Sequence, residues 1–480
     1  MKNTMLKLTL TTILVANLTA CGGEGGSANT SSSTVTNSSN TTNTTQSTSS
    51  PYQGYWQSDD ESKVLAIDVS NHQGETKEYQ LNPVGCLLRN QYANSELSNQ
   101  FGELNLSNDS EQINWQAQHS FEQRHFSRIS ALPTNCQASQ LTQASDDPEL
   151  NFNWIWHAIN EHYAGFEVRD IDWQGIKQTI ETQLNDNQSQ NWQHFGKILD
   201  ALEDPHAFLI SLDHGVKQSI QLTPLHQKVA NDNAINANNT NYHQIQNLTT
   251  ARLEQAGQVI ISQYLQNPQI LASEQVIYGE LKGSSAYINI RSMNLDGDDN
   301  LSNINKANEI TAKLSQLLTN KTELIIDLRF NLGGNLPAAK IIADSLATIA
   351  DTAYYMSFKQ TDGYSNANSY KVEPSDQGFS GDIKILTSPL TGSAAEAFIY
   401  YLKAGHNNVE LIGENTRGVQ SAPIKHQLPN GWQVLIPARK ITGPMGEYLE
   451  NSGFSPDIMI ESFSQQDINE QKDTVLESLQ

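Results

Sequence analysis

The chain has 480 residues, of which 37% are hydrophobic and 17% are charged, and its formal net charge is −23. This length allows two or more domains with a sizeable core, which excludes peptide toxins and mini-scaffolds. The acidic balance makes binding to the phosphate backbone of nucleic acids unfavourable. Three cysteines are too few for a disulfide framework or a zinc ribbon.

Residues 1–20 have the order of a secretory signal peptide. Lys2 and Lys7 precede an apolar stretch that is too short to span a bilayer permanently, and small residues precede Cys21. The sequence L-T-A-C at 18–21 resembles a bacterial lipobox, which implies that Cys21 is acylated and becomes the mature N-terminus. Gly22 after this cysteine resembles the signal for export to the outer membrane. We therefore expect a lipoprotein anchored there, facing the periplasm or the surface.

Two regions follow before the chain becomes helical. Of the 24 residues from 27 to 50, 21 are Ser, Thr or Asn, so residues 21–50 are expected to form a disordered tether. Residues 51–145 alternate apolar and polar positions in short runs, which predicts a small β-rich domain. This region holds Cys86 and Cys136, and an oxidising compartment favours a disulfide between them. His119 and His125 lack a familiar ligand spacing, so no metal site is predicted.

The remainder of the chain is predicted to be a helical part, 146–275, and an α/β core, 276–480. Apolar residues recur at three- and four-residue steps within 147–212, which indicates two or more helices, and the pattern weakens within 213–275. From 276 onward short apolar runs at 286–290, 324–326 and 383–386 alternate with helical patterns near 304–318 and from 336. Such alternation is typical of α/β proteins.

Two turns of this core carry candidate chemistry. The apolar strand at 324–328 leads to Gly333 and Gly334 and then to a helix, so free backbone amides could hold an anion or an oxyanion there. An ordinary strand-to-helix turn is the alternative. Ser393 begins a second helix, where it could cap the helix together with Glu396. A nucleophile would also be favoured at Ser393, because the helix dipole and the amide of Ala394 stabilise negative charge.

Taken jointly, four ordered motifs resemble the C-terminal processing peptidases and tricorn core proteases, a family of serine peptidases. The motifs are D-L-R-F-N-L-G-G at 327–334, T-G-S-A-A-E at 391–396, G-E-N-T-R-G at 413–418 and E-N-S-G-F-S-P-D at 450–457. The resemblance covers about residues 150–480 and includes no recognisable PDZ module. It implies a crotonase-like (Clp-protease-like) α/β spiral core and hydrolysis of peptides or unfolded proteins without a metal or an organic cofactor.

The same resemblance implies a role for each site residue. Val419 stands where the processing peptidases have a catalytic lysine, whereas L-E-D-P-H at 202–206 resembles the histidine segment of the tricorn-like branch. His206 is then the base that deprotonates Ser393, and a histidine suits this task because its pKa lies near neutrality. Glu450 maps onto the acidic member that orients or charges the site. The backbone amides of Gly333 or Gly334, with that of Ala394, would hold the oxyanion.

Several alternatives stay open at this level. Lys425, Lys440 or His426 could supply the base if His206 does not. Arg329 and Arg417 are expected to pair with acids or with a substrate carboxylate rather than to act in bond cleavage. The fold also occurs in the interphotoreceptor retinoid-binding protein, so a non-catalytic binding protein is a rival interpretation, and an esterase or amidase is another.

Overall fold

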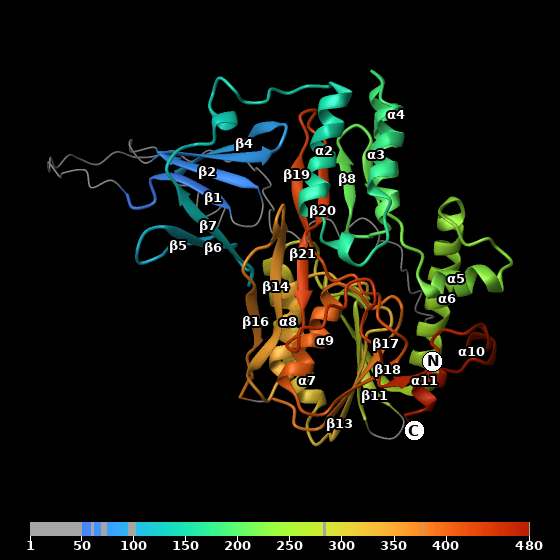
Figure 1. Cartoon of the computed structure of the whole chain (residues 1–480). Coiled ribbons are helices and arrows are strands. Elements are labelled where there is room, and N and C mark those ends of the chain that lie inside the picture. Colours follow the sequence, from blue (N-terminus) through green and yellow to red (C-terminus); the bar gives the residue numbers. More distant parts are fainter. Residues whose placement is uncertain are drawn as a thin grey trace, which may run out of the picture. The chain divides into compact units, whose positions relative to one another are not determined.

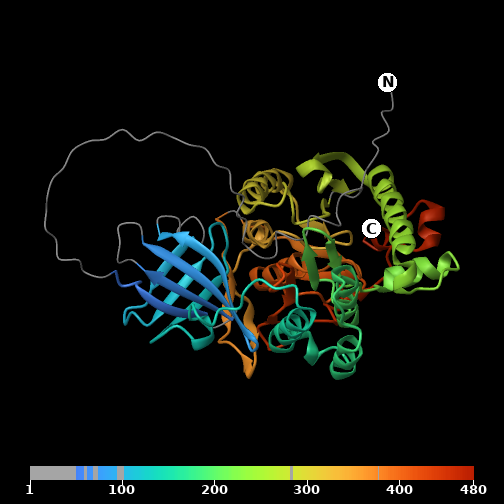
Figure 2. The same ribbon diagram turned by 90° about the horizontal axis from the view of Figure 1, so that it is seen from above.

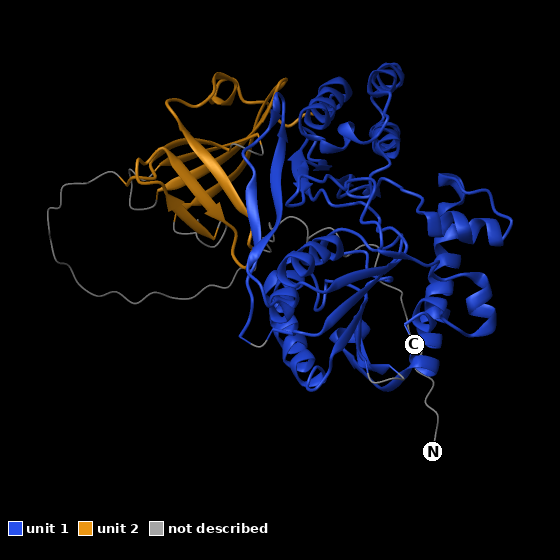
Figure 3. Cartoon of the chain, turned by 60° about the horizontal axis from the view of Figure 1, so that its bottom comes forward, with its two compact units in different colours: residues 1–22, 146–480 blue, residues 23–145 orange. Residues whose placement is uncertain are grey.

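The computed structural model describes residues 50–58, 62–68, 74–94, 102–281, 285–376 and 378–479. The signal peptide, Cys21 and the tether predicted before residue 50 lie outside these residues. The described chain divides into two compact units, residues 50–145 and residues 146–479 (Figure 3). Over the described ranges, no helix has both the length and the apolar character needed to cross a membrane.

The unit formed by residues 50–145 is the β-rich region that the alternating pattern predicts. Its described strands form one antiparallel sheet in the order β4-β3-β2-β1-β7-β6-β5, whose curvature is visible in Figure 2. Val64 and Leu65, neighbours on β2, are buried in two different apolar clusters, as the two-residue period of a strand requires. The strands are β1 (Gly54–Ser58), β2 (Lys63–Asp68), β3 (Glu75–Asn82), β4 (Gly85–Ala93), β5 (Glu103–Leu106), β6 (Gln112–Gln116) and β7 (Gln123–Ile129).

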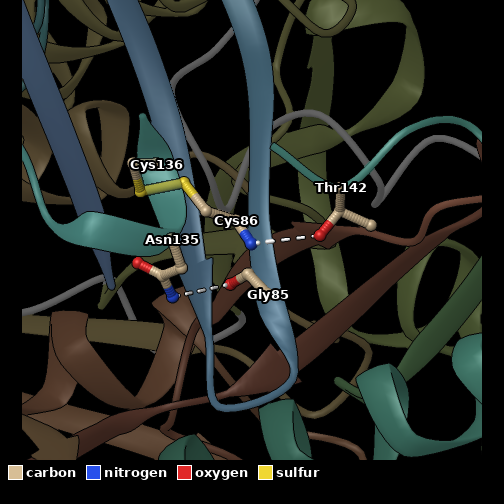
Figure 4. The surroundings of a disulfide bond; sticks show 5 residues. All are labelled: Gly85, Cys86, Asn135, Cys136 and Thr142. Carbon is tan, nitrogen blue, oxygen red and sulfur yellow. Dashed lines mark hydrogen bonds between the residues drawn. A yellow bond between two sulfur atoms is a disulfide. The ribbon is translucent and has the colours of Figure 1, made fainter. Parts of the chain in front are cut away.

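A disulfide bond joins Cys86, on β4, to Cys136 at the end of the 3-10 turn η3 (Thr134–Cys136) (Figure 4). Both cysteines are fully buried. The amide of Cys86 donates to Thr142 Oγ1 over 3.2 Å, and the Asn135 side chain donates to the carbonyl of Gly85 over 3.4 Å. The Thr142 amide also donates to the carbonyl of Cys86 over 2.9 Å. The segment after β7 is therefore fastened back onto β4 by a covalent bond and by three hydrogen bonds.

The second unit is built on a mixed sheet in the order β10-β11-β12-β13-β17-β18-β22 (Figure 1). The strands from β12 to β22 are parallel to one another, whereas β10 and β11 are antiparallel. These strands are β10 (Leu265–Leu271), β11 (Val276–Leu281), β12 (Ala286–Ile290), β13 (Glu323–Asp327), β17 (Asp382–Thr387), β18 (Val409–Gly413) and β22 (Ile458–Met459).

Helices cover both faces of this sheet. On β13, Leu324 and Ile326 belong to the cluster that contains α7 (Asn300–Leu317), α8 (Leu336–Leu346) and α9 (Ala394–Gly405). Ile325, between them, belongs to a second cluster with α5, α6 and α11. A strand that is buried on both faces is apolar at every position, which explains the continuous run that the sequence shows. The second group of helices is α5 (Pro224–Asp232), α6 (Tyr242–Val259), α10 (Gln465–Glu470) and α11 (Thr474–Glu477).

The helices expected within 147–212 are α2 (Pro148–His162), α3 (Trp173–Glu181) and α4 (Gln188–Leu202). Two strands that the helical pattern does not predict follow them, β8 (Phe208–Ser211) and β9 (Gly215–Gln218). β8 pairs antiparallel with β20 (Gln433–Pro437), which in turn pairs with β19 (Pro423–Gln427). This pairing brings the chain just before β8 to the chain just before β19.

A further sheet lies beside α9, in which β14 pairs with β15, β16 and β21. Its inward side chains, such as Tyr354 and Phe358, join the same cluster as Phe398 of α9. The strands are β14 (Asp351–Gln360), β15 (Gly363–Tyr364), β16 (Asn368–Val372) and β21 (Arg439–Thr442).

Candidate active site

Ser393 stands on a sharp turn between β17 and α9. Its backbone has φ 56° and ψ −126°, a conformation that costs a residue with a side chain about 1–3 kcal/mol. The amide of Ser393 is held by the carbonyl of Val419 at 2.9 Å and by Glu396 Oε2 at 3.2 Å. The side chain remains partly exposed at the start of the helix. Strained turns of this kind present a nucleophile outward at a helix N-terminus.

The glycine turn after β13 lies directly against the Ser393 turn. A Cβ atom built on Gly333, whose φ is 112°, would lie 2.5 Å from the Cβ of Ser393 and 2.8 Å from the carbonyl of Gly392. Only glycine can therefore occupy this position without displacing the serine. The amide of Gly392 donates to the carbonyl of Asn331 over 3.1 Å, which fixes the two turns to each other.

The two glycine amides differ in their availability to an oxyanion. The amide of Gly333 donates to Asn331 Oδ1 over 2.8 Å, so it is already engaged. Neither the amide of Gly334 nor that of Ala394 donates to any residue that the structure describes. Of the amides expected from the sequence, those of Gly334, which follows Gly333, and of Ala394, which follows Ser393, are thus available to an oxyanion, and Gly333 contributes space instead.

Arg329 pairs with acids, which decides between the two roles expected for it. Its Nε and Nη2 donate to the two carboxylate oxygens of Asp327 over 3.0 and 2.7 Å, and its Nη1 donates to Asp473. All three side chains are buried. Ser388 Oγ donates to the Arg329 carbonyl over 2.6 Å, so this buried ion cluster also supports the loop that leads to Ser393.

His206 lies between α4 and β8, and its ring is tied to the chain that precedes β19. Nδ1 lies 2.8 Å from the carbonyl of Ser421, and since a carbonyl only accepts, Nδ1 carries the proton and Nε2 is the basic atom. The His206 amide donates to Asp204 Oδ1 over 3.0 Å. Burial lowers the pKa of His206, while Asp204 and the bond to Ser421 act in the opposite direction. The ring is therefore neutral near pH 7, as a base must be.

Residues 418–421, which we call the 418–421 segment, connect the candidate nucleophile and the candidate base. Ser393 donates its amide to the carbonyl of Val419, and His206 donates Nδ1–H to the carbonyl of Ser421, two residues further along. The two side chains are thus placed by one short stretch of backbone, although His206 and Ser421 are 215 residues apart in sequence.

Glu396 holds one end of the 418–421 segment. Its Oε1 accepts from Thr416 Oγ1 at 2.5 Å and from the amide of Gly418 at 2.9 Å. Its Oε2 accepts from the amides of Val419 at 3.0 Å and Ser393 at 3.2 Å. Burial raises the pKa of Glu396 to about 7, against the four hydrogen bonds, which favour the ionised form. The sequence indicates only its capping role, because the contacts with 416–419 come from a loop that no local pattern connects to α9.

Glu450 holds the other end of the 418–421 segment. Its Oε2 accepts from the amides of Gln420 and Ser421, each at 2.9 Å. Burial and the neighbouring Asp204 raise the pKa of Glu450 to about 7, and a nearby guanidinium lowers it. Within the described chain no hydrogen bond joins Glu450 to His206 directly, so Glu450 acts on the base through Ser421.

Arg169 is that guanidinium, and no sequence pattern points to it. It bridges Glu450, at 3.2 Å, and Asp204, at 3.4 Å, and its side chain is 6% exposed. Tyr163 adds a hydrogen bond from its hydroxyl to Asp204 Oδ2 over 3.0 Å. Arg169 lies in the loop after η4 (Ala164–Glu167), and its two acids come from far along the chain. A long-range ion cluster of this kind leaves no periodic or motif signal.

The alternative bases lie elsewhere on the structure. Lys440, on β21, forms an ion pair with Glu167 at 2.6 Å. His426, on β19, packs its ring 4.9 Å from that of His162, and Lys425 precedes it on the same strand. In the part of the chain that the structure describes, no group of His, Cys, Asp and Glu side chains is arranged to hold a metal ion.

A comparison with protein families matches the part of the chain that carries the two turns of this site. Residues 284–460 match the model of peptidase family S41, a range that includes the four motifs and Ser393 but not His206. No curated protein matches the sequence.

Several solved structures resemble the chain. Their sequence identity to it is low, so the likeness concerns the fold alone. A presumed peptidase from Parabacteroides merdae is 21% identical, with 69% of this chain and 95% of that chain covered and a TM-score of 0.53. The photosystem II D1 C-terminal processing protease is 17% identical, over 65% of this chain and 93% of that one, with a TM-score of 0.43. Mature CPAF in complex with lactacystin is 12% identical, with 68% of this chain and 95% of that chain covered and a TM-score of 0.47.

Proposed function

We propose that Ser393 is the nucleophile of this serine-type hydrolase and that His206 is its base. Residues 284–460 match the model of peptidase family S41, which supports hydrolysis of peptides or proteins. The observation that carries the proposal is the common attachment of both residues to the 418–421 segment. His206 lies outside the matched range, so its role rests on this geometry.

In the proposed reaction Ser393 Oγ attacks the carbonyl carbon of the scissile peptide bond, and its proton passes to Nε2 of His206. The carbonyl oxygen becomes an oxyanion, which the amides of Gly334 and Ala394 stabilise at the N-terminus of α9. His206 returns the proton to the leaving amine as the C–N bond breaks. Water then attacks the acyl-serine with His206 again as the base, which releases the acid and restores the serine.

Glu450 and Arg169 are positioning residues in this scheme. Glu450 fixes the amides of Gln420 and Ser421, and the Ser421 carbonyl fixes the tautomer of His206. Arg169 forms an ion pair with each of two acids, Glu450 and Asp204. Both residues thereby act on the base without touching the substrate.

We propose that the substrates are exported proteins or peptides and that the enzyme is lipid-anchored through Cys21 to the bacterial outer membrane. The lipobox-like sequence at 18–21 and the disulfide of Cys86 and Cys136 support export to an oxidising compartment. Metabolic labelling with a radioactive fatty acid tests the anchor: the label is expected on the native protein and is lost in Cys21→Ser.

The test of catalysis is turnover of unfolded casein and of a mixed peptide library by the full chain, beside Ser393→Ala and His206→Ala. Each variant is expected to lose at least about a thousandfold in activity, because the two residues act as a unit. His119→Asn is the matched control, since His119 is exposed on the other unit. Turnover by His206→Ala at the native rate would remove the base assignment, and absence of turnover by a folded native protein would contradict the proposal.

A further inference from the structure

Arg417 places a guanidinium along the turn that carries Ser393. Its amide donates to the carbonyl of Thr391 over 2.7 Å. A Cβ atom built on Gly392 would lie 3.4 Å from the Cβ and 3.5 Å from the Cδ of Arg417. The side chain of Arg417 therefore extends directly beside the residue that precedes the nucleophile.

This guanidinium has no acidic partner among the residues that the structure describes. Its Nε donates to Gln221 Oε1 over 3.0 Å, and neither Nη1 nor Nη2 has an acceptor there. The side chain is partly exposed. Burial lowers the pKa of the Arg417 guanidinium, while the charges of Asp204 and Glu396 act in the opposite direction without a hydrogen bond to it. By contrast, Arg329 and Arg169 each bind two carboxylates. Of the two roles expected for Arg417, pairing with an acid of the protein is thus not realised.

Arg291 is a second arginine without an acidic partner among the described residues, and its role is in packing. It is 6% exposed, its guanidinium lies 5.3 Å from the centre of the Phe330 ring, and its Nε donates to Asn289 Oδ1 over 3.0 Å. Arg291 is enclosed by its neighbours, whereas Arg417 keeps part of its side chain exposed beside the turn that carries the candidate nucleophile. A planar fork of free N–H donors in such a position is suited to bidentate binding of a carboxylate.

The position of Arg417 relative to His206 indicates which part of a substrate it meets. Arg417 directly precedes the 418–421 segment, whose Ser421 carbonyl holds Nδ1 of His206 at 2.8 Å. Burial lowers the pKa of His206, and the charge of Arg417 adds to this effect. A base that returns its proton to the leaving amine has to lie beside the leaving group. A carboxylate bound by Arg417 would therefore belong to the part of the substrate that follows the scissile bond.

We propose that Arg417, oriented by Gln221, is a specificity-determining residue that binds a carboxylate on the leaving side of a peptide substrate. This inference rests on the proposed peptidase function. The carboxylate comes either from an Asp or Glu side chain next to the scissile bond or from the C-terminus of a short leaving peptide. The formal net charge of the chain is −23, so a local cation is needed to offset its general repulsion of acidic substrates.

Paired peptides distinguish these sources. One pair has Glu or Gln directly after the bond that the enzyme cleaves, and the other ends in a free carboxylate or in an amide. We expect kcat/KM of the native enzyme to favour the acidic member of at least one pair by roughly tenfold or more, as for a charge-assisted hydrogen bond. In Arg417→Gln this ratio is expected to fall to about one.

Gln221→Glu separates substrate binding from a merely structural role of Arg417. The substitution keeps the size of the side chain and its acceptor, and it supplies the carboxylate that Arg417 lacks. In this variant the new carboxylate should hold the Arg417 guanidinium more firmly and neutralise its charge. The preference of kcat/KM for the acidic peptide of each pair is then expected to vanish. A structural role would leave the ratio unchanged. Lys403→Gln is the matched control, because Lys403 is an exposed cation at the far end of α9, and it should keep the native ratio.

Two results would overturn the inference. The first is a native ratio near one in both pairs, and the second is a preference that survives in Arg417→Gln. If the native protein cleaves no peptide, the proposed function fails, and binding of fluorescent peptide pairs to Ser393→Ala tests Arg417 by itself. Tighter binding of the acidic peptide, lost in the double variant with Arg417→Gln, supports the site, while equal or undetectable binding of both members contradicts it.

Discussion

The two sides of the candidate site are built by different means. The nucleophile side consists of two turns that leave the neighbouring parallel strands β13 and β17 and are joined by backbone and hydroxyl hydrogen bonds. The base side is contributed by residues before the matched family range and depends on the pairing of β8 with β20 and on buried charges. Steric change between the two turns should therefore disturb the nucleophile side directly, although the ion cluster of Arg329 also supports its loop. The base side should respond most to change of charge.

This difference has an energetic origin. Backbone hydrogen bonds between packed strands survive most substitutions of side chains. A buried ion cluster such as Asp204, Arg169 and Glu450 loses much more when one member is removed, because the remaining charges stay desolvated without a partner. The following substitutions and pH changes test each side separately.

Replacement of Arg169 by methionine is expected to have the largest effect, and on the base side. Two buried carboxylates would lose their shared cation, which should lower the free energy of unfolding by about 3–5 kcal/mol and displace the support of His206. Urea unfolding followed by tryptophan fluorescence measures the first effect, and kcat/KM the second. Lys177→Met breaks a more exposed pair with Glu181 and should cost less than about 1 kcal/mol. Equal losses of stability in the two variants would show that the buried ion cluster contributes no more than an exposed ion pair.

Gly333→Ala tests the nucleophile side by steric change alone. The added methyl group would lie 2.5 Å from the Cβ of Ser393, so the serine has to move, and kcat/KM should fall by roughly a hundredfold or more. Gly431→Ala is the matched control, because Gly431 also has a positive φ, 84°, but no atom within 4 Å of the added carbon. Backbone strain at a positive φ should cost each variant about 1 kcal/mol of stability, and the contact with Ser393 adds to this cost in Gly333→Ala. Only Gly333→Ala should lose activity. Activity retained in Gly333→Ala would show that the turns are not rigid.

Acidification should weaken the helical part that carries the base. Burial lowers the pKa values of His162 and His226 to about 4, so between pH 6.5 and 4 the unfolded chain binds more protons than the folded chain. The stability that each neutral ring contributes is therefore present above pH 6.5 and is lost as the pH falls. Burial raises the pKa values of Glu396 and Glu450 to about 7, and these groups act with the opposite sign.

A difference measurement isolates one histidine from these opposing groups. The unfolding free energy of the native protein minus that of His162→Gln should decrease by about 2 kcal/mol between pH 7.5 and pH 5. Urea unfolding at both pH values provides the comparison. A difference that stays constant would mean that His162 is not held neutral by its surroundings.

Much of the nucleophile side could be predicted from the sequence because its signals are local. An apolar strand, a glycine pair and a strong helix former follow one another within a few residues, and the turns at Gly333 and Ser393 have this order in the structure. The same patterns could not show that Asn331 engages the Gly333 amide, because one side-chain rotamer decides this.

The base side exceeds what local patterns contain. The helical period within 147–212 predicts α2, α3 and α4, but β8 is only four residues long and finds its partner β20 more than 200 residues later. Arg169 and Glu450, 281 residues apart, form an ion pair that no periodicity announces. His206 could be proposed only from a resemblance, since a histidine after Asp-Pro has no local feature that marks it as a base.

The disulfide between Cys86 and Cys136 has a mechanical consequence. It bridges cysteines separated by 50 positions in sequence, so a pulling force applied at residue 50 and at residue 146 passes through the bond and bypasses residues 87–135, which include most of β4. That stretch would otherwise extend by about 170 Å at roughly 3.4 Å per residue. Under tension only the strands before Cys86 can be pulled out of the sheet and extended. β5, β6 and β7 lie within the loop that the disulfide closes, so the force cannot extend them.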